Sequence, residues 1–116
     1  NLGVELNADG TLSGTKNYVA DAGVADIFIA VANEGGAPVL AIVECDALGE
    51  AAMSQNTLID LTKRAGNVDF TGAVPALVIR GEAVATALRD TLLLGALFTA
   101  AETAGGAEKG LRSITE

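Results

Sequence analysis

Apolar and polar residues follow two different patterns along this chain of 116 residues. Up to residue 80, short apolar runs rich in Val, Ile and Phe alternate with Gly, Asn and Asp, which is the pattern of β-strands separated by turns. From Gly81 onward, apolar residues recur at helical spacing. The sequence therefore predicts a β-rich part over residues 1–80 and a helical part over residues 81–116.

The strand pattern is strongest in two neighbouring segments. Residues 26–32 and 38–44 are rich in Ile and Val, and the turn cluster 33–36 separates them, so we predict an antiparallel hairpin. Weaker patterns predict further strands at 4–6, 15–20, 67–70 and 75–80, whereas 51–58 fits either a strand or a helical turn. The expected fold class is α+β: a small antiparallel β-barrel or sandwich followed by a long C-terminal α-helix.

The predicted helix is apolar on every side over part of its length. Residues 92–98 read LLLGALF, and a helix that is apolar all round is expected to be buried all round. Residues 82–116 would extend for about 50 Å, and no other helical pattern in the chain can bury them. We therefore expect residues 84–98 to form a homo- or hetero-oligomer. Gly105-Gly106 either ends the helix or allows the close approach of a neighbouring backbone.

Charge and composition narrow the classes of function. The net charge is −8 and there is no His, which argues against nucleic-acid binding and a zinc site, so we predict no metal. No apolar run is long enough to predict a membrane span. The single cysteine, Cys45, cannot form an internal disulfide, which suits a reducing, cytoplasmic location.

Three further patterns have two readings each. Asp60, Lys63 and Arg64 fit a solvated turn or a contact with a nucleotide phosphate. For Cys45, the pattern favours a buried packing residue over a reactive thiol, because its neighbours are acidic. Gly10 and Gly14 are spaced as in a glycine-rich loop but favour a hairpin, since no helix pattern follows them.

Several segments, taken in order, resemble one enzyme family. They are GTLSGTKNYV at 10–19, DAGVADIF at 21–28, VECDALG at 43–49, DLTKR at 60–64 with VDF at 68–70, and AAETAGGAEKGL at 100–111. Together they resemble the acyl-CoA dehydrogenase family, from its middle β-domain into the first long helix of its C-terminal domain. The resemblance implies a fragment, with an incomplete middle β-barrel domain at 1–80 and the start of the helical bundle domain at 81–116.

The resemblance also implies a function and a site. The parent enzyme would oxidise an acyl-CoA thioester to the 2,3-enoyl-CoA with FAD as hydride acceptor, and an electron-transfer flavoprotein-like partner would reoxidise it. Tyr18, Val19 and Ala20 would form one wall of the flavin site, with Tyr18 covering one face of the ring. The family's catalytic glutamate would follow Glu116, so no catalytic residue is assigned and the chain alone is expected to be inactive.

Departures from the family pattern leave other functions open. Ala20 stands where the family often has Ser or Thr, and Asp21 stands where a neutral polar residue is commoner. In addition, residues 93–96 are apolar, whereas in the family polar side chains often line the acyl-CoA cleft there. These features also fit a non-catalytic structural subunit or assembly module of a heteromeric acyl-CoA dehydrogenase. A third reading is an unrelated β-barrel binding module without flavin.

Overall fold

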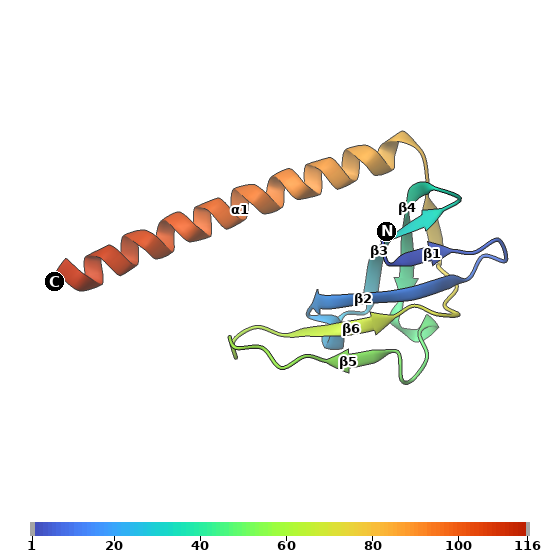
Figure 1. Ribbon diagram of the computed structural model, residues 1–116, viewed down its shortest axis with the longest axis horizontal. Helices are drawn as coiled ribbons and strands as arrows, with labels where there is room; N and C mark the ends of the chain where they lie inside the picture. The colour runs from blue at the N-terminus through green and yellow to red at the C-terminus, as the bar shows by residue number, and fades with distance from the viewer. Residues whose placement is uncertain (1, 116) are drawn as a thin grey trace. The chain divides into compact units, whose positions relative to one another are not determined.

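The computed structural model describes residues 2–115, which form seven strands, two short 3-10 turns and one long helix. The strands are β1 (Val4–Leu6), β2 (Leu12–Ala20), β3 (Ile27–Glu34), β4 (Ala37–Glu44), β5 (Met53–Gln55), β6 (Ala65–Asp69) and β7 (Leu77–Ile79). The 3-10 turns are η1 (Ala22–Val24) and η2 (Cys45–Ala47), and the helix is α1 (Glu82–Thr115). Figure 1 shows this order from the blue N-terminal strands to the red end of the helix.

The predicted hairpins are present. β3 and β4 pair antiparallel over their whole length, from Ile27 opposite Glu44 to Glu34 opposite Ala37. β1 and β2 form a second hairpin through the Asp9-Gly10 turn, where Gly10 has a φ of 85°. The segment at 51–58, which the sequence left open between strand and helical turn, contains the short edge strand β5.

The barrel prediction is wrong, because the sheet is open. Its strand order is β5-β6-β2-β1-β3-β4-β7, and no ladder within residues 2–115 joins the two edge strands, β5 and β7. The sheet is also mixed, since the connection through η1 carries the chain past β1, and β3 then pairs parallel to β1 at Glu5 and Asn33. Both edge strands are only three residues long, which leaves little backbone with which to close a barrel.

The hydrophobic core lies between the two halves of this bent sheet. In Figure 1, β3 and β4 cross the direction of β2, β6 and β5. Phe28 of β3 and Phe70, just after β6, bring their ring centroids to 5.9 Å at an interplanar angle of 84°, the edge-to-face geometry that aromatic pairs prefer. Small and β-branched side chains fill the remaining core: Val4, Leu12, Ala32, Val39, Ala41, Val43 and Val68 are nearly or fully buried.

One half of the sheet is apolar on both faces. Phe28 and Ala30 of β3 point into the core. Ile27 and Ile29, which alternate with them along the strand, are 58% and 68% exposed. Leu77 of the edge strand β7 is 54% exposed and lies opposite Ile42 in the ladder. This outer face is therefore mostly apolar, with Asn33 and Glu44 as its polar residues on β3 and β4, whereas polar residues normally cover a solvent-facing sheet surface.

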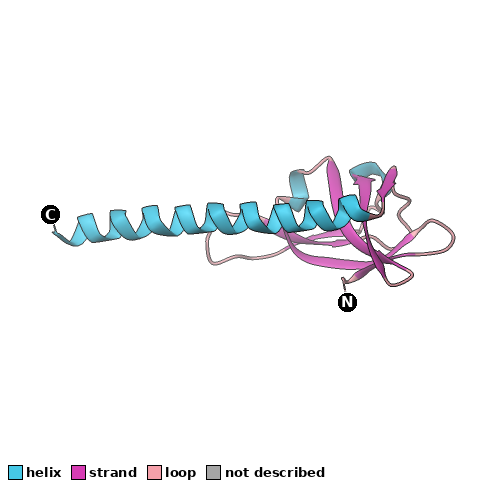
Figure 2. Ribbon diagram, turned by 90° about the horizontal axis from the view of Figure 1, so that it is seen from above, coloured by secondary structure: helices cyan, strands magenta, loops and turns pink. Residues whose placement is uncertain are grey.

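The helix α1 is continuous over Glu82–Thr115, as the unbroken ribbon in Figure 2 shows. Gly105-Gly106 does not end it, so that alternative is wrong, and within residues 2–115 there is open space where a side chain would lie at either glycine. Leu92 and Phe98 are 75% and 69% exposed. By length and composition alone, α1 is also long and apolar enough to cross a membrane.

The chain divides into two compact units, residues 1–84 and 85–116. The first contains the whole sheet and ends at Val84, which is 1% exposed. The second consists of the remaining turns of α1. The candidate site described next belongs entirely to the first unit.

Candidate functional site

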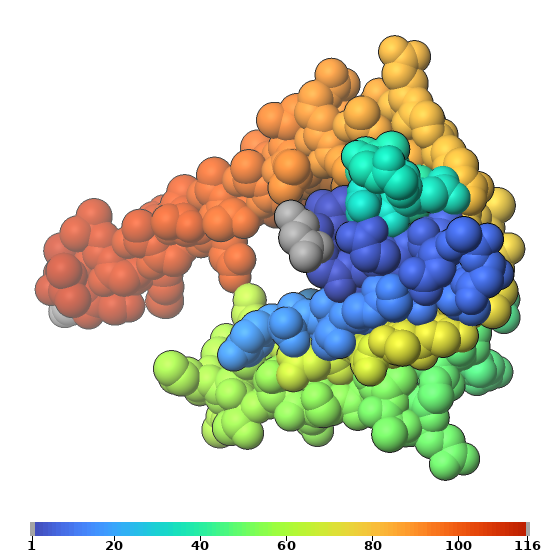
Figure 3. Space-filling view, turned by 45° about the vertical axis from the view of Figure 1, so that its right-hand side comes forward, coloured from blue at the N-terminus to red at the C-terminus, as the bar shows by residue number. Residues whose placement is uncertain are grey.

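The predicted flavin wall lies where β2 departs from regular strand geometry. β2 pairs antiparallel with β6, but the register shifts between Lys16 and Val19, which marks a bulge. Tyr18 sits in this bulge with a φ of 56°, a left-handed conformation that non-glycine residues seldom adopt. The residue is 71% exposed. Figure 3 shows β2 (light blue) lying alongside β6 (yellow).

The backbone amide at the bulge is held by a side chain. The Tyr18 N–H donates to the Asn67 side-chain carbonyl, Oδ1, at 3.2 Å, and the amide nitrogen of Asn67 lies 3.4 Å from the Ser54 hydroxyl oxygen of β5. Two residues before the bulge, the Lys16 amino group donates to the Leu2 carbonyl, and partial burial lowers the pKa of Lys16. The bulge is therefore tied to β6 on one side and, through Lys16, to the segment that precedes β1 on the other.

The other two predicted residues take different surroundings. Val19 lies opposite Gly66 and packs against the hydrophobic core, so its side chain supports the fold. Ala20 lies opposite Ala65 and is exposed. Thus Tyr18 and Ala20 offer side chains to a ligand on this surface, whereas the side chain of Val19 is engaged by the core.

Asp21, which the sequence marked as unusual beside a flavin, has a partner. Its φ is 53°, its N–H donates to the Arg64 carbonyl at 3.1 Å, and its Oδ1 lies 3.0 Å from both Nε and a terminal nitrogen of the Arg64 guanidinium. Both side chains are about 60% exposed, so the pair adds little to stability. It does place a positive charge directly beside the carboxylate.

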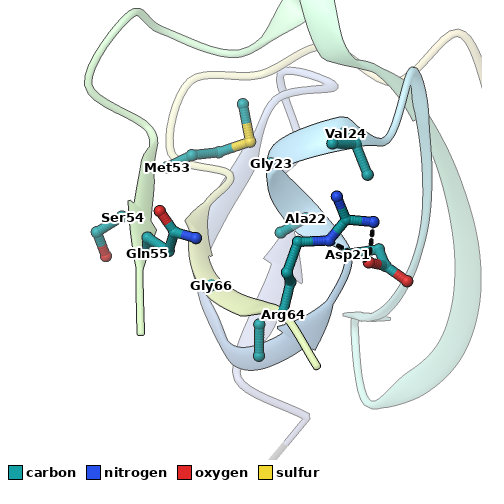
Figure 4. Close-up of a pocket in the computed structure, with 10 residues that line it drawn as sticks. Asp21, Ala22, Gly23, Val24, Met53, Ser54, Gln55, Arg64 and Gly66 are labelled. Carbon is teal, nitrogen blue, oxygen red and sulfur yellow. Dashed lines mark hydrogen bonds and ion pairs between the residues drawn. The ribbon is translucent and has the colours of Figure 1, made fainter. Parts of the chain in front are cut away.

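Two hollows adjoin this ion pair. The first, of ≈ 400 Å³, lies between η1 and the strands β5 and β6, and Figure 4 shows Met53, Val24 and the Asp21–Arg64 pair around it. The second, of ≈ 550 Å³, lies on the side of residues 61–64 and includes Ala20. Tyr18 lines neither of these two hollows. The predicted trio therefore does not line one cavity: Tyr18 is exposed outside these two hollows, Val19 packs against the core and Ala20 lines the second hollow.

The other residues that the sequence singled out differ in their surroundings. Asp60 accepts hydrogen bonds from the hydroxyl and N–H of Thr62, at 2.6 and 2.9 Å, and these lower its pKa, with Lys63 contributing less. Arg64 pairs with Asp21, and Lys63 and Arg64 both line the second hollow. Cys45 packs against the core from η2. Within residues 2–115 no three His, Cys, Asp or Glu side chains gather as a metal site would require.

Sequence reasoning missed Asn67 and the pairing of Asp21 with Arg64. Neither had a local signal, because Arg64 follows Asp21 by 43 positions and Asn67 follows Tyr18 by 49. The one available hint was that Asn67 is a polar residue within the short strand β6, next to Val68.

A second missed pair joins Arg80 to Glu34 through two hydrogen bonds of 2.6 and 2.7 Å, which lower the pKa of Glu34.

Comparison with known proteins identified no relative of this chain. A scan against protein-family models, a search of curated proteins and a search of solved structures each found no match.

Proposed function

We propose that this chain is part of an FAD-dependent acyl-CoA dehydrogenase, in which the end of β2 forms one wall of the flavin site. The observation that carries the proposal is the pairing of an exposed aromatic ring, Tyr18, with the small exposed residue Ala20 on one strand. A flat apolar surface of this kind suits a planar heteroaromatic ring, and aromatic stacking adds about 0.5–1.5 kcal/mol beyond burial.

The reaction of such an enzyme would remove a proton from the α-carbon and a hydride from the β-carbon of an acyl-CoA, leaving a 2,3 double bond. FAD, when bound, supplies the hydride acceptor. Tyr18 would cover one face of the ring, and Ala20 would approach it without a hydroxyl donor. Arg64 supports the proposal, because its guanidinium compensates the Asp21 carboxylate that would otherwise oppose the negative charge of a reduced flavin.

The proposal includes assembly and location. The exposed apolar surface of α1 supports a homo- or hetero-oligomer formed through residues 84–98. Residues 91–101, between Asp90 and Glu102, are uncharged but extend for only about 16 Å, less than the hydrocarbon core of about 30 Å. Helix packing therefore explains α1 better than a membrane span, and we place the enzyme in the cytoplasm with an electron-transfer flavoprotein-like acceptor.

The second candidate is a non-catalytic structural subunit or assembly module of a heteromeric acyl-CoA dehydrogenase. Ala20 favours it, since the side chain offers a methyl group where the family often offers a hydroxyl. Both candidates use α1 for association, and only the first requires bound flavin.

Absorbance of the protein expressed from its complete coding region tests the proposal. A yellow protein whose flavin bands bleach on addition of an acyl-CoA would support the dehydrogenase. A folded, colourless protein would contradict flavin binding and favour the structural subunit. Tyr18→Leu should weaken flavin binding by about tenfold, the equivalent of one aromatic contact, whereas Tyr18→Phe keeps the ring and serves as the matched control.

A further inference from the structure

The bulge of β2 carries a backbone conformation that its own residue disfavours. Tyr18 is a bulky residue at a φ of 56°, and such a conformation typically costs about 1–2 kcal/mol for a residue with a Cβ. It persists only where the surroundings hold it. Tyr18 is 71% exposed, so packing of its side chain in the core does not hold this conformation.

The contact that does hold this backbone comes from Asn67. At the register shift the Tyr18 N–H has left the regular ladder, and the side-chain carbonyl of Asn67 accepts it at 3.2 Å. Asn67 lies opposite Ser54 in the β5–β6 ladder and is half-buried. Its amide group therefore has a defined orientation, with its oxygen toward β2 and its nitrogen toward β5.

We propose that Asn67 is a positioning residue: through its hydrogen bond to Tyr18 it keeps the β2 bulge in the left-handed conformation and so presents the Tyr18 ring and Ala20 as a preformed ligand surface. The identity of the ligand as a flavin rests on the proposed function, whereas the positioning by Asn67 does not. Loss of the bond lowers the population of the binding-competent bulge, and ligand affinity falls by the same factor.

Amide hydrogen exchange at Tyr18, measured by NMR on the whole protein, tests the positioning directly. In Asn67→Leu the Tyr18 amide should exchange about fivefold faster than in the wild type, as expected for the loss of one hydrogen bond, while the amides of β3 and β4 stay unchanged. Asn67→Asp keeps an acceptor and should restore protection. Ser54→Ala removes only the 3.4 Å contact on the far side of the amide and is the matched control.

Titration of the same variants with FAD, followed by the change in flavin fluorescence on binding, gives the second readout. The affinity should fall about fivefold in Asn67→Leu and recover in Asn67→Asp. If leucine unfolds the strand, Asn67→Ser, whose side chain is too short to reach Tyr18, replaces it.

Unchanged Tyr18 exchange in Asn67→Leu would overturn the proposal, as would faster exchange with unaltered FAD affinity. A wild-type protein that binds no FAD would count against the proposed function alone. In that event the exchange of the Tyr18 amide still decides whether Asn67 positions the bulge.

Discussion

Two residues near the end of β2, Tyr18 and Asp21, have a positive φ although neither is glycine. Each is held from the β6 side of the sheet, Tyr18 by the amide of Asn67 and Asp21 by the carbonyl and guanidinium of Arg64. Residues in such conformations cluster at ligand-binding sites, and they persist only where the surrounding structure stabilises them. At the scale of single residues, this segment is thus the strongest structural candidate for a site.

Gly14 should tolerate no side chain. A Cβ there would lie 2.1 Å from the Gly3 carbonyl oxygen, and its φ is 109°. Gly14→Ala should therefore lower the free energy of unfolding by about 3 kcal/mol, through overpacking and an unfavourable φ together. Gly10→Ala is the control, because Gly10 also has a positive φ but has open space around it; it should cost about 1 kcal/mol. Equal losses in urea unfolding would show that the contact with Gly3 is not limiting.

Asp60 should contribute stability that depends on pH. Hydrogen bonds from Thr62, first from its hydroxyl and then from its N–H, lower the pKa of Asp60 in the folded protein. A lowered folded-state pKa gives stability that is present above the unfolded-state value of about 3.9 and is lost as the pH falls through the folded-state value.

Thr62→Val removes the hydroxyl donor, so the pKa of Asp60 should rise toward its ordinary value and the variant should lose less stability than the wild type between about pH 5 and pH 2. Thr62→Ser keeps the hydroxyl and should behave as the wild type. NMR titration of the Asp60 carboxyl carbon measures the pKa, and an identical curve in Thr62→Val would contradict the prediction.

At the scale of elements, the strands and the helix differ in what stabilises them. The strands β1–β7 share one core, whose members come from both halves of the sheet. The helix α1 beyond residue 84 has no buried residue among those described, and it contains Gly95, Gly105, Gly106 and Gly110, each costing about 1 kcal/mol relative to Ala. Its apolar side chains therefore need a partner.

Association through α1 should depend on its apolar N-terminal half. Leu97→Glu places a charge among exposed apolar residues of the proposed interface, and burying that charge in an oligomer is unfavourable. The variant should be monomeric in light scattering at micromolar concentration, whereas the wild type forms dimers or larger oligomers. Ser113→Glu adds the same charge outside residues 84–98 and should leave association intact. A wild-type protein that is monomeric would refute this role of α1.

At the scale of the whole molecule, the sheet and the helix are separate compact units. Among the described residues, the buried hydrophobic ones lie within residues 4–84. Since the sheet unit has its own core, we expect it to fold without residues 85–116.

A chain ending at Val84 should consequently keep its β-sheet circular dichroism and unfold in one cooperative transition. Residues 85–116 alone should show little helix as a monomer, because helix nucleation is costly and glycine is frequent there. Loss of the cooperative transition in the shortened chain would show instead that the sheet depends on α1.

The sequence alone determined the local elements. The richness of 26–32 and 38–44 in β-branched residues, with a turn cluster between them, predicted the β3–β4 hairpin, and the helical spacing after Gly81 predicted α1 almost to its ends. Hydrophobic periodicity encodes these features, because each depends on neighbours a few positions away.

Only the tertiary structure decided how these elements combine. The open sheet order, the parallel pairing of β1 with β3, the bulge held by Asn67 and the pairing of Asp21 with Arg64 all join residues distant in sequence. Periodicity carries no information about such pairs, since it fixes which face of an element is apolar but not which element it meets. The physical reason is that register, closure and side-chain partners are set by packing across the core, after the local elements have formed.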